Sequence, residues 1–237
     1  RRPIDMLTQG KSSLMNPNEV TGKKVLLVED HPLTREGLCR AIDEEPDLCV
    51  CAETDTAADA LEAIRALKPD VAVVDLMLPD KDGLQLIKDI RERFPEVAVL
   101  VVSARSESLY AERALHAGAL GYIPKLEATT KVVEGIRKVI RGDLYISEDT
   151  SQRMIRKQIG ARTVTSGVPE ERLSDREFQI FELIGHGYST SEIAEKLHIS
   201  VKTVESHRER MKNKLELESA RKLLRYAIEW LLSEARR

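Results

Sequence analysis

Three acidic side chains stand at the ends of short apolar runs in the first half of the 237-residue sequence. Asp75 closes the β-branched run 71–74, and Glu29 and Asp30 follow the apolar run 24–28. Such runs predict buried parallel strands, and an open α/β sheet binds its ligands beyond the carboxyl ends of its strands. The three carboxylates are therefore candidates for a single site.

Two further polar side chains follow later apolar runs: Ser103 ends the run 97–102, and Lys125 follows the run 120–123. Carboxylates that lie close together repel one another, and Mg²⁺ relieves that repulsion because it prefers oxygen ligands. With the cation bound, Asp75 can attack phosphorus while the hydroxyl and the ammonium neutralise the phosphoryl oxygens. The pattern predicts transfer of a phosphoryl group to Asp75, giving an acyl phosphate.

The elements that would position these side chains alternate along the chain. Five apolar runs, each followed by an amphipathic segment, predict a five-stranded parallel, doubly wound sheet of the flavodoxin-like α/β class. The predicted strands are 24–29, 48–52, 71–75, 97–102 and 120–123, and the predicted helices are 33–45, 56–67, 84–94, 109–116 and 129–141.

Composition limits the class of protein. The formal net charge of −3 excludes a uniformly basic nucleic-acid coat but allows a local basic surface. The cysteines, Cys39, Cys49 and Cys51, have no metal-binding spacing and are interpreted as buried, reduced thiols. No apolar stretch approaches the ~18 residues of a membrane span, so we predict a soluble, cytoplasmic protein. Residues 1–22 are polar and aperiodic and are expected to form a disordered tail.

Residues 24–141 resemble a receiver domain of two-component signalling in the order and spacing of the acids, hydroxyl and lysine. The resemblance implies a domain over 23–142 with these roles: Asp75 as phosphoacceptor, Glu29 and Asp30 as the acidic metal-binding pair, Met77 as a backbone-carbonyl ligand, Ser103 and Tyr122 as switch residues, and Lys125 as the phosphate contact. One departure is Leu126, where many receivers have a proline. Tyr122 has an alternative interpretation as an aromatic that fills the gap between helices.

From residue 173 onward the sequence predicts only short, capped helices, after a short helix and linker over 143–172. The patterns Ser174–Glu177 and Ser189–Glu192 are capping boxes, and Ser200 caps a longer helix over 201–215. A short helix, a turn and a second helix form a helix-turn-helix. Residues 173–237 closely resemble the LuxR-type four-helix output domain, and 24–235 as a whole resemble a NarL/FixJ-type response regulator.

The helix over 201–215 is the predicted DNA-binding element. Its predicted inward stripe is apolar and consists of Val201, Val204, Met211 and Leu215. Its residues 201–214 carry five basic and two acidic side chains, a local charge that suits phosphate contacts. Two glutamates on the groove-facing side predict weak binding by a single domain, which dimerisation would offset. The candidate DNA contacts are Lys202, Thr203, Glu205, Ser206, Arg208, Glu209, Arg210, Lys212 and Lys214.

The last helix, over 219–235, has an apolar face that the family uses for dimerisation. Its candidate dimer residues are Leu223, Ala227, Trp230 and Leu231. The alternative interpretation of the same face is packing inside one domain.

The predicted function is regulation of transcription controlled by phosphorylation. A histidine kinase would phosphorylate Asp75 with the help of Mg²⁺, and dimers would bind double-stranded DNA, with RNA polymerase as a further candidate partner and no membrane contact. The protein would not be an enzyme beyond its own phosphorylation and dephosphorylation. Two rivals remain: a constitutive DNA-binding regulator whose receiver is only a dimer scaffold, and an aspartate-nucleophile phosphatase. The second rival lacks the usual second acid, because position 77 is methionine.

Overall fold

The computed structural model describes residues 22–158, 169–197 and 199–234. Within this part of the chain there are two compact units, one containing residues 22–104 and 114–145 and the other containing 105–113 and the described residues from 146 onward. The predicted tail lies outside the described residues except for Gly22, as do residues 159–168 of the predicted linker and His198.

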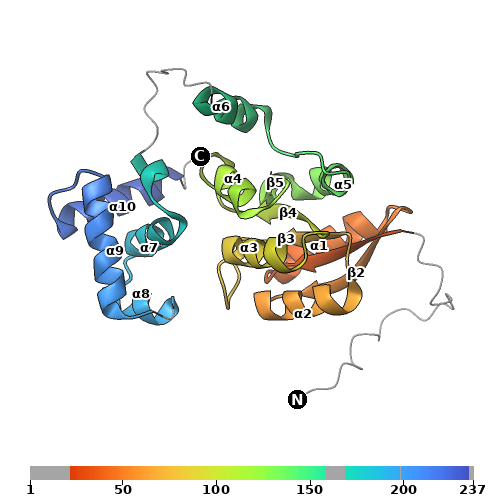
Figure 1. The fold of residues 1–237 in the computed structure, drawn as a ribbon, viewed down its shortest axis with the longest axis horizontal. Helices are drawn as coiled ribbons and strands as arrows, with labels where there is room; N and C mark the ends of the chain where they lie inside the picture. The colour runs from red at the N-terminus through yellow and green to blue at the C-terminus, as the bar shows by residue number, and fades with distance from the viewer. Residues whose placement is uncertain (1–21, 159–168, 198, 235–237) are drawn as a thin grey trace, which may run out of the picture. The chain divides into compact units, whose positions relative to one another are not determined.

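The first unit is built on a parallel sheet whose strands run in the order β2-β1-β3-β4-β5 (Figure 1). The predicted α/β class is confirmed. All four residues of the central strand β3 are buried, because helices cover both faces of the sheet. The strands are β1 (Lys23–Val28), β2 (Leu48–Thr54), β3 (Val71–Val74), β4 (Ala98–Ser103) and β5 (Gly121–Pro124).

The helices between the strands supply two covering layers. α1 (Pro32–Asp43) packs against α5 (Ala128–Ile140), and both contribute to one core together with alternate residues of the strands. α2 (Ala57–Leu67) contacts β1, β2 and α3 (Gly83–Arg93). α4 (Glu107–Ala117) connects β4 to β5, and its residues 107–113 are grouped with the second unit. This arrangement leaves the carboxyl ends of the strands for the loops that carry the polar residues.

The outer edge of β5 is covered by the chain that follows α5. Tyr145 forms a parallel bridge with Gly121, and its amide donates to the carbonyl of Leu120 at 2.9 Å. The amide of Tyr122 donates to the carbonyl of Tyr145 at 2.8 Å. Pairing of this kind satisfies an exposed strand edge, so Tyr145 belongs with the sheet although it lies beyond the predicted boundary at residue 142.

The second unit contains the helical output region. Both predicted capping boxes are present, with Ser174 and Glu177 opening α7 and Ser189 and Glu192 opening α8. The elements are α6 (Glu148–Gln158), a 3₁₀ turn (Pro169–Arg172), α7 (Asp175–Gly185), α8 (Thr190–Lys196), α9 (Val201–Lys214) and α10 (Ala220–Glu234). None of the helices that the structure describes is long and apolar enough to cross a membrane.

Candidate functional site

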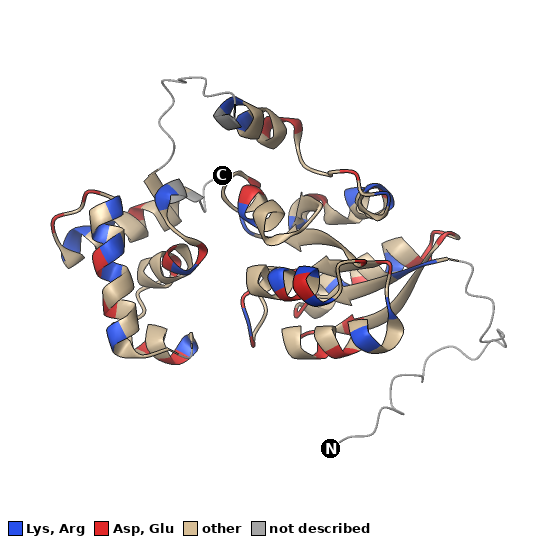
Figure 2. Ribbon diagram, in the orientation of Figure 1, with Lys and Arg blue, Asp and Glu red and all other residues tan. Residues whose placement is uncertain are grey.

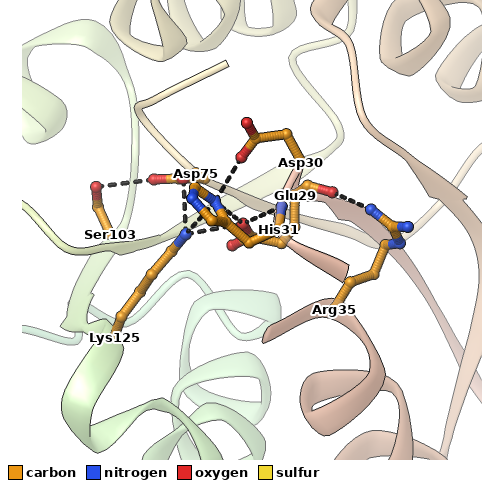
Figure 3. A network of polar contacts seen from close by, with 7 residues as sticks. All are labelled: Glu29, Asp30, His31, Arg35, Asp75, Ser103 and Lys125. Atoms are coloured by element: carbon orange, nitrogen blue, oxygen red, sulfur yellow. Dashed lines mark hydrogen bonds and ion pairs between the residues drawn. The ribbon is translucent and has the colours of Figure 1, made fainter. Parts of the chain in front are cut away.

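The predicted acids, hydroxyl and lysine come together beyond the carboxyl ends of the strands (Figure 3). Glu29 and Asp75 are both 2% exposed. The ammonium of Lys125 lies 2.8 Å from Glu29 Oε1 and 2.8 Å from Asp75 Oδ2. The hydroxyl of Ser103 donates to Asp75 Oδ1 at 2.8 Å, so both oxygens of this carboxylate are held by donors.

The register of β1 and β3 explains why Glu29 and Asp75 lie close together. Val28 is opposite Val74 in the parallel pair of β1 and β3, and the amide of Asp75 donates to the carbonyl of Val28 at 2.9 Å. The residues that follow the two strands, Glu29 and Asp75, therefore emerge at the same level. Lys125 enters from the 3₁₀ turn (Lys125–Glu127) that follows β5.

A close approach of the backbone fixes the loop after β3. The amide of Gly83 donates to the carbonyl of Leu76 at 3.0 Å. This hydrogen bond joins the two ends of the loop 76–83, which follows Asp75. A Cβ atom at Gly83 would lie 2.5 Å from the carbonyl oxygen of Asp75 and 2.5 Å from Leu76 Cα. Only glycine fits here without moving the backbone of the phosphoacceptor candidate.

Lys125 carries the positive charge of the site. Burial lowers its pKa, but hydrogen bonds to Asp75 and Glu29 more than offset burial, and the net pKa lies above the ordinary value of 10.5. The ammonium is therefore charged at neutral pH and partly neutralises the two buried carboxylates.

The acid cluster fits a divalent cation. Glu29, Asp30, His31 and Asp75 each offer one ligand atom, and these atoms lie within 4.8 Å of one another. Glu29 Oε2 is buried and has no hydrogen-bond partner among the described residues. An unsatisfied buried carboxylate oxygen is unfavourable, and a hard cation such as Mg²⁺ would satisfy it.

The structure shows where two further predicted receiver residues, Tyr122 and Met77, lie, and their roles stay predictions. Tyr122 is 2% exposed, so its ring lies inside the unit, and its action as a switch stays a prediction. Met77 follows β3 and forms an isolated bridge with Asp82. Its carbonyl as a metal ligand also stays a prediction.

Two residues at the site had no predicted role there. The ring of His31 lies beside the acids, and the guanidinium of Arg35 donates to the carbonyl of Glu29 at 2.6 Å. The position of His31 directly after the acidic pair is a signal that sequence reasoning could have used. Arg35 gives no such signal, because its contact depends on how α1 packs beside β1.

The predicted DNA-binding helix α9 has one buried and one exposed side. Val204 and Met211 are fully buried, and Leu215 just after the helix is also buried, as the predicted inward stripe requires. Val201, predicted to share that stripe, is instead 43% exposed because it lies at the first turn of the helix. Basic residues run along α9, interrupted by two acidic residues, and only basic charges follow Glu209 (Figure 2). The exposed candidates are Lys202, Thr203, Glu205, Ser206, Glu209, Arg210 and Lys214.

Four charged candidates on α9 already have side-chain partners within the unit. Arg208 donates to the Thr190 hydroxyl at 3.1 Å, which ties α9 to the start of α8. Lys212 and Glu209 form an ion pair with each other at 2.7 Å. Lys214 pairs with the capping glutamate of α7, Glu177, at 2.6 Å. Among the predicted contacts, Lys202 and Arg210 are therefore the exposed cations best placed to meet a phosphate.

Burial also affects one histidine of this helix. Desolvation, and then the charge of Arg210, lower the pKa of His207 below its ordinary value of 6.5, although the charge of Glu177 opposes the shift. His207 is only partly exposed. At neutral pH it is uncharged and adds no attraction for phosphate.

Comparison with known proteins gives a family match for each of the two predicted domains. Residues 25–137 match the family model for the response regulator receiver domain, and residues 171–227 match the model for bacterial regulatory proteins of the luxR family. The oxygen regulatory protein NreC of Staphylococcus carnosus (strain TM300) is 35% identical over 212 residues, covering 86% of this chain and 96% of NreC. The chain belongs to the NarL/FixJ-type response regulators.

A further relative supports this assignment, and a solved structure shows the same fold. The response regulator GacA of Pseudomonas aeruginosa is 35% identical over 196 residues, covering 83% of this chain and 91% of GacA. A structure of RcsB from Salmonella enterica serovar Typhimurium, bound to promoter P1flhDC in the presence of the phosphomimetic BeF3-, has a TM-score of 0.66. It is 24% identical and covers 87% of this chain and 98% of RcsB, so this likeness concerns the fold.

The predicted dimer residues of this response regulator lie mostly inside its output domain. Leu223 and Ala227 are fully buried and Trp230 is 8% exposed, because α10 packs against α7. The ring of Trp230 lies 5.3 Å from that of Phe178 and 5.5 Å from that of Phe181. The alternative of packing inside one domain thus accounts for these three residues. Leu231, the fourth, is partly exposed.

The cysteines of the response regulator are free and half-buried. Burial, followed by the charge of Glu53 and a hydrogen bond to it, raises the pKa of the Cys39 thiol to about 12. Burial also raises the pKa of Cys49 and Cys51. The thiols are protonated at neutral pH and therefore poor nucleophiles.

Proposed function

We propose that a histidine kinase phosphorylates this response regulator on Asp75 with the assistance of Mg²⁺. The phosphorylated form then dimerises, binds double-stranded DNA through α9 and regulates transcription in the cytoplasm, with RNA polymerase as a further partner. The observation that carries the proposal is the environment of Asp75, a buried carboxylate held by Ser103 and Lys125 beside Glu29 and Asp30.

The residues of the site divide the work of phosphoryl transfer. An oxygen of Asp75 forms the new O–P bond as the bond from phosphorus to the donor breaks, and the donor leaves with the electron pair. The hydroxyl of Ser103 and the ammonium of Lys125, already hydrogen-bonded to Asp75, can turn to the incoming phosphoryl oxygens and neutralise their charge. Glu29, Asp30 and Asp75 would hold the Mg²⁺, which supplies further neutralisation of charge.

The acyl phosphate adds negative charge where Ser103 and Lys125 now bind a carboxylate. Redirecting these two groups toward the phosphoryl group would change the loops after β4 and β5 and favour a second conformation of the receiver. We propose that the unphosphorylated receiver or linker masks the DNA-binding helix or the dimer face, and that phosphorylation shifts this equilibrium.

Acetyl phosphate with Mg²⁺ tests the proposal without the cognate kinase. The wild-type protein is expected to gain the mass of one phosphoryl group, to form dimers and to bind operator DNA more tightly. Asp75→Asn is expected to show none of these changes, while Asp143→Asn, which alters an exposed acid, should behave as wild type. No gain in mass, or the same gain in Asp75→Asn, contradicts the assignment of Asp75.

The same experiment separates the two rivals. A constitutive regulator would bind DNA equally with and without the phosphoryl group. A phosphatase would turn over a generic phosphate ester repeatedly, whereas a receiver is modified once and slowly loses the group.

Exposed cations on α9 should account for the salt dependence of DNA binding. Lys202→Ala is expected to weaken binding to all sequences and to reduce the slope of log K against log salt by about 0.9, the value for one lost phosphate contact. Arg210→Ala should act in the same way, whereas Glu205→Ala should change base preference because a glutamate can accept from cytosine. Fluorescence anisotropy at several salt concentrations measures both effects.

The matched control for these cations is Lys222→Ala, which removes a cation of α10 that pairs with Glu218. Its binding curve and salt slope should match those of the wild type. If Lys202→Ala and Arg210→Ala behave like this control, a surface other than α9 meets DNA.

Because the first dimer candidates are mostly buried, we propose the exposed side of α10 as the dimer face. Leu224 and Ile228 are each 38% exposed and Leu232 is 55% exposed, and their spacing places them along one side of the helix. We expect Ile228→Glu to prevent dimerisation of the phosphorylated protein without unfolding it. Sedimentation of acetyl-phosphate-treated protein measures this, with Leu67→Glu, at an equally exposed leucine of α2, as the control. Dimers that survive Ile228→Glu would show that another face forms the interface.

A further inference from the structure

The chain that leaves α5 turns back and lies along the outer edge of β5. The amides of Gly142 and Asp143 donate to the carbonyls of Val139 and Lys138 at 3.0 and 3.1 Å, which closes the end of the helix. Gly142 has a φ of 84°, a left-handed conformation that favours glycine, and the turn at this residue returns the chain to the sheet. We call residues 143–145, which follow the turn, the strap.

Tyr145 is the strap residue that pairs with the strand. Its amide donates to the carbonyl of Leu120 at 2.9 Å, and its carbonyl accepts from the amide of Tyr122 at 2.8 Å. The pairing is an isolated bridge, with Gly121 as the opposite residue. Local opening costs less free energy where few contacts hold a segment, so the strap can leave the strand without unfolding the sheet.

Two glycines make room for Tyr145. A Cβ atom at Gly121 would lie 2.9 Å from the carbonyl oxygen of Tyr145 and 3.0 Å from its Cβ. A Cβ atom at Gly135 of α5 would lie 3.1 Å from Cδ1 of the Tyr145 ring and 3.0 Å from Ile123 Cδ1. The tyrosine therefore packs closely against both α5 and β5, and a shift of β5 would change its contacts.

Polar contacts orient the ring of Tyr145. Its hydroxyl donates to Glu134 Oε2 at 3.1 Å, and the ammonium of Lys138 lies 5.2 Å from the ring centroid. Glu134 is exposed and Lys138 is partly exposed, so each contact contributes little. The docked position thus rests on several weak contacts, which is what a segment with two accessible positions requires.

The strap lies between the phosphorylation site and the output region along the chain. Its partner β5 carries Tyr122, the predicted switch aromatic, and Lys125 follows the end of this strand. Tyr145 is the last residue of the first unit, and the chain enters the second unit at Ile146. A change in β5 can therefore reach the start of the linker through a single residue.

We propose that Tyr145 transmits phosphorylation of Asp75 to the linker by leaving the edge of β5. In the unphosphorylated protein the docked strap restricts the chain that follows it and disfavours DNA binding. When Lys125 turns to the phosphoryl group, β5 shifts, the hydrogen bond from Tyr122 to the strap breaks and the linker is freed. The inference rests on the proposed function, because phosphorylation of Asp75 is its input, and it adds the residue that carries the signal out of the receiver.

DNA binding by the unphosphorylated, full-length protein tests the restriction. The probe is a genomic DNA fragment selected for binding by the wild type after treatment with acetyl phosphate. Tyr145→Ala removes the ring and is expected to bind this fragment about tenfold more tightly than the untreated wild type, a size usual for coupling between sites. Tyr145→Phe keeps the ring and should stay close to the wild type.

Leu144→Ala is the matched control, because Leu144 lies in the same strap and is 58% exposed. Its DNA affinity should equal that of the wild type. Equal affinities of Tyr145→Ala and Leu144→Ala overturn the inference.

Hydrogen exchange of the wild type gives a readout that a purely structural role would not move. The amides of Tyr122 and Tyr145 are hydrogen-bonded while the strap is docked. Acetyl phosphate with Mg²⁺ should remove the protection of both amides, leave the buried residues of β1 protected, and have no effect on Asp75→Asn. Protection of both amides that survives phosphorylation overturns the inference, even if Tyr145→Ala fails to fold.

Failure of the inference can be told apart from failure of the proposed function. If Asp75 is labelled and DNA binding tightens while both amides stay protected, the proposed function holds and the strap is not its route. If Tyr145→Ala binds DNA more tightly but Asp75 is not labelled, the restriction by Tyr145 stands and the phosphoacceptor assignment fails.

Discussion

Gly83→Ala is expected to destabilise the receiver by about 2–3 kcal/mol, near the upper end of the cost of overpacking. The added Cβ would lie 2.5 Å from two backbone atoms, the carbonyl oxygen of Asp75 and Leu76 Cα, and backbone cannot turn aside as a flexible side chain can. Relief of the clash requires the loop behind Asp75 to move. The same variant should therefore be labelled more slowly by acetyl phosphate.

Gly37→Ala is the matched control, because it adds the same methyl group to another glycine of the receiver. Gly37 lies inside α1, and its Cβ would meet only Thr129 Cγ2 at an ordinary contact distance of 3.7 Å. Alanine is the better helix former, so this variant should be neutral or more stable by about 0.5–1 kcal/mol.

Urea unfolding followed by far-ultraviolet circular dichroism measures both variants. The single tryptophan, Trp230, lies in α10, so its fluorescence follows the output domain and should keep its midpoint in both proteins. Equal stability of Gly83→Ala and Gly37→Ala would contradict the prediction, because the loop after β3 would then accommodate the added methyl group with little loss of free energy.

Lys125→Met is expected to cost about 3 kcal/mol in the absence of divalent cations, a value typical of removing one partner of a buried ion pair. The side chains of Asp75 and Glu29 are 1% and 3% exposed, so water cannot replace the lost ammonium. Added Mg²⁺ should recover part of the loss by placing positive charge between the carboxylates. Labelling of Asp75 should also slow, because one neutralising group is gone.

Lys131→Met is the matched control, since Lys131 pairs with Glu127 on the surface of α5 and both side chains are about half exposed. Such pairs contribute little, and the change should be below about 0.5 kcal/mol. Thermal unfolding with and without Mg²⁺ compares the two variants. If they behave alike, the lysine at the site does not compensate the buried acids.

The pH dependence of the Lys125 interaction follows from the direction of its shift. Hydrogen bonds to Asp75 and Glu29 hold the pKa of Lys125 above 10.5 against the opposing effect of burial, so folding favours the charged form. The resulting contribution to stability is fully present at pH values below 10.5. It is lost as the pH rises through the higher pKa that Lys125 has in the folded protein. The difference between the wild type and Lys125→Met should therefore stay constant across neutral pH.

The sequence by itself determined the architecture and most of the receiver site. Continuous apolar runs such as 71–74 indicate strands covered on both faces, and parallel strands bring the residues after them to one edge. For this reason Glu29, Asp75 and Lys125 could be assigned to one site before any distance was known. The capping boxes likewise marked the starts of α7 and α8, because capping depends on residues close in sequence.

Only the tertiary structure decided which of several suitable faces is covered. Both Leu223 and Leu224 are apolar residues of α10, and packing against α7 buries the first and leaves the second 38% exposed. Lys214 resembles the other cations of α9 in sequence, yet in the fold it pairs with Glu177.

The same limit applies to contacts made by residues distant in sequence. Tyr145 extends the sheet by pairing with Gly121, and no local pattern around Tyr145 specifies that partner. His31 is adjacent to the acids in sequence, but only the start of α1 decides that its ring turns toward them. Local patterns record periodicity and caps, whereas the choice of partner depends on the free energy of packing the whole domain.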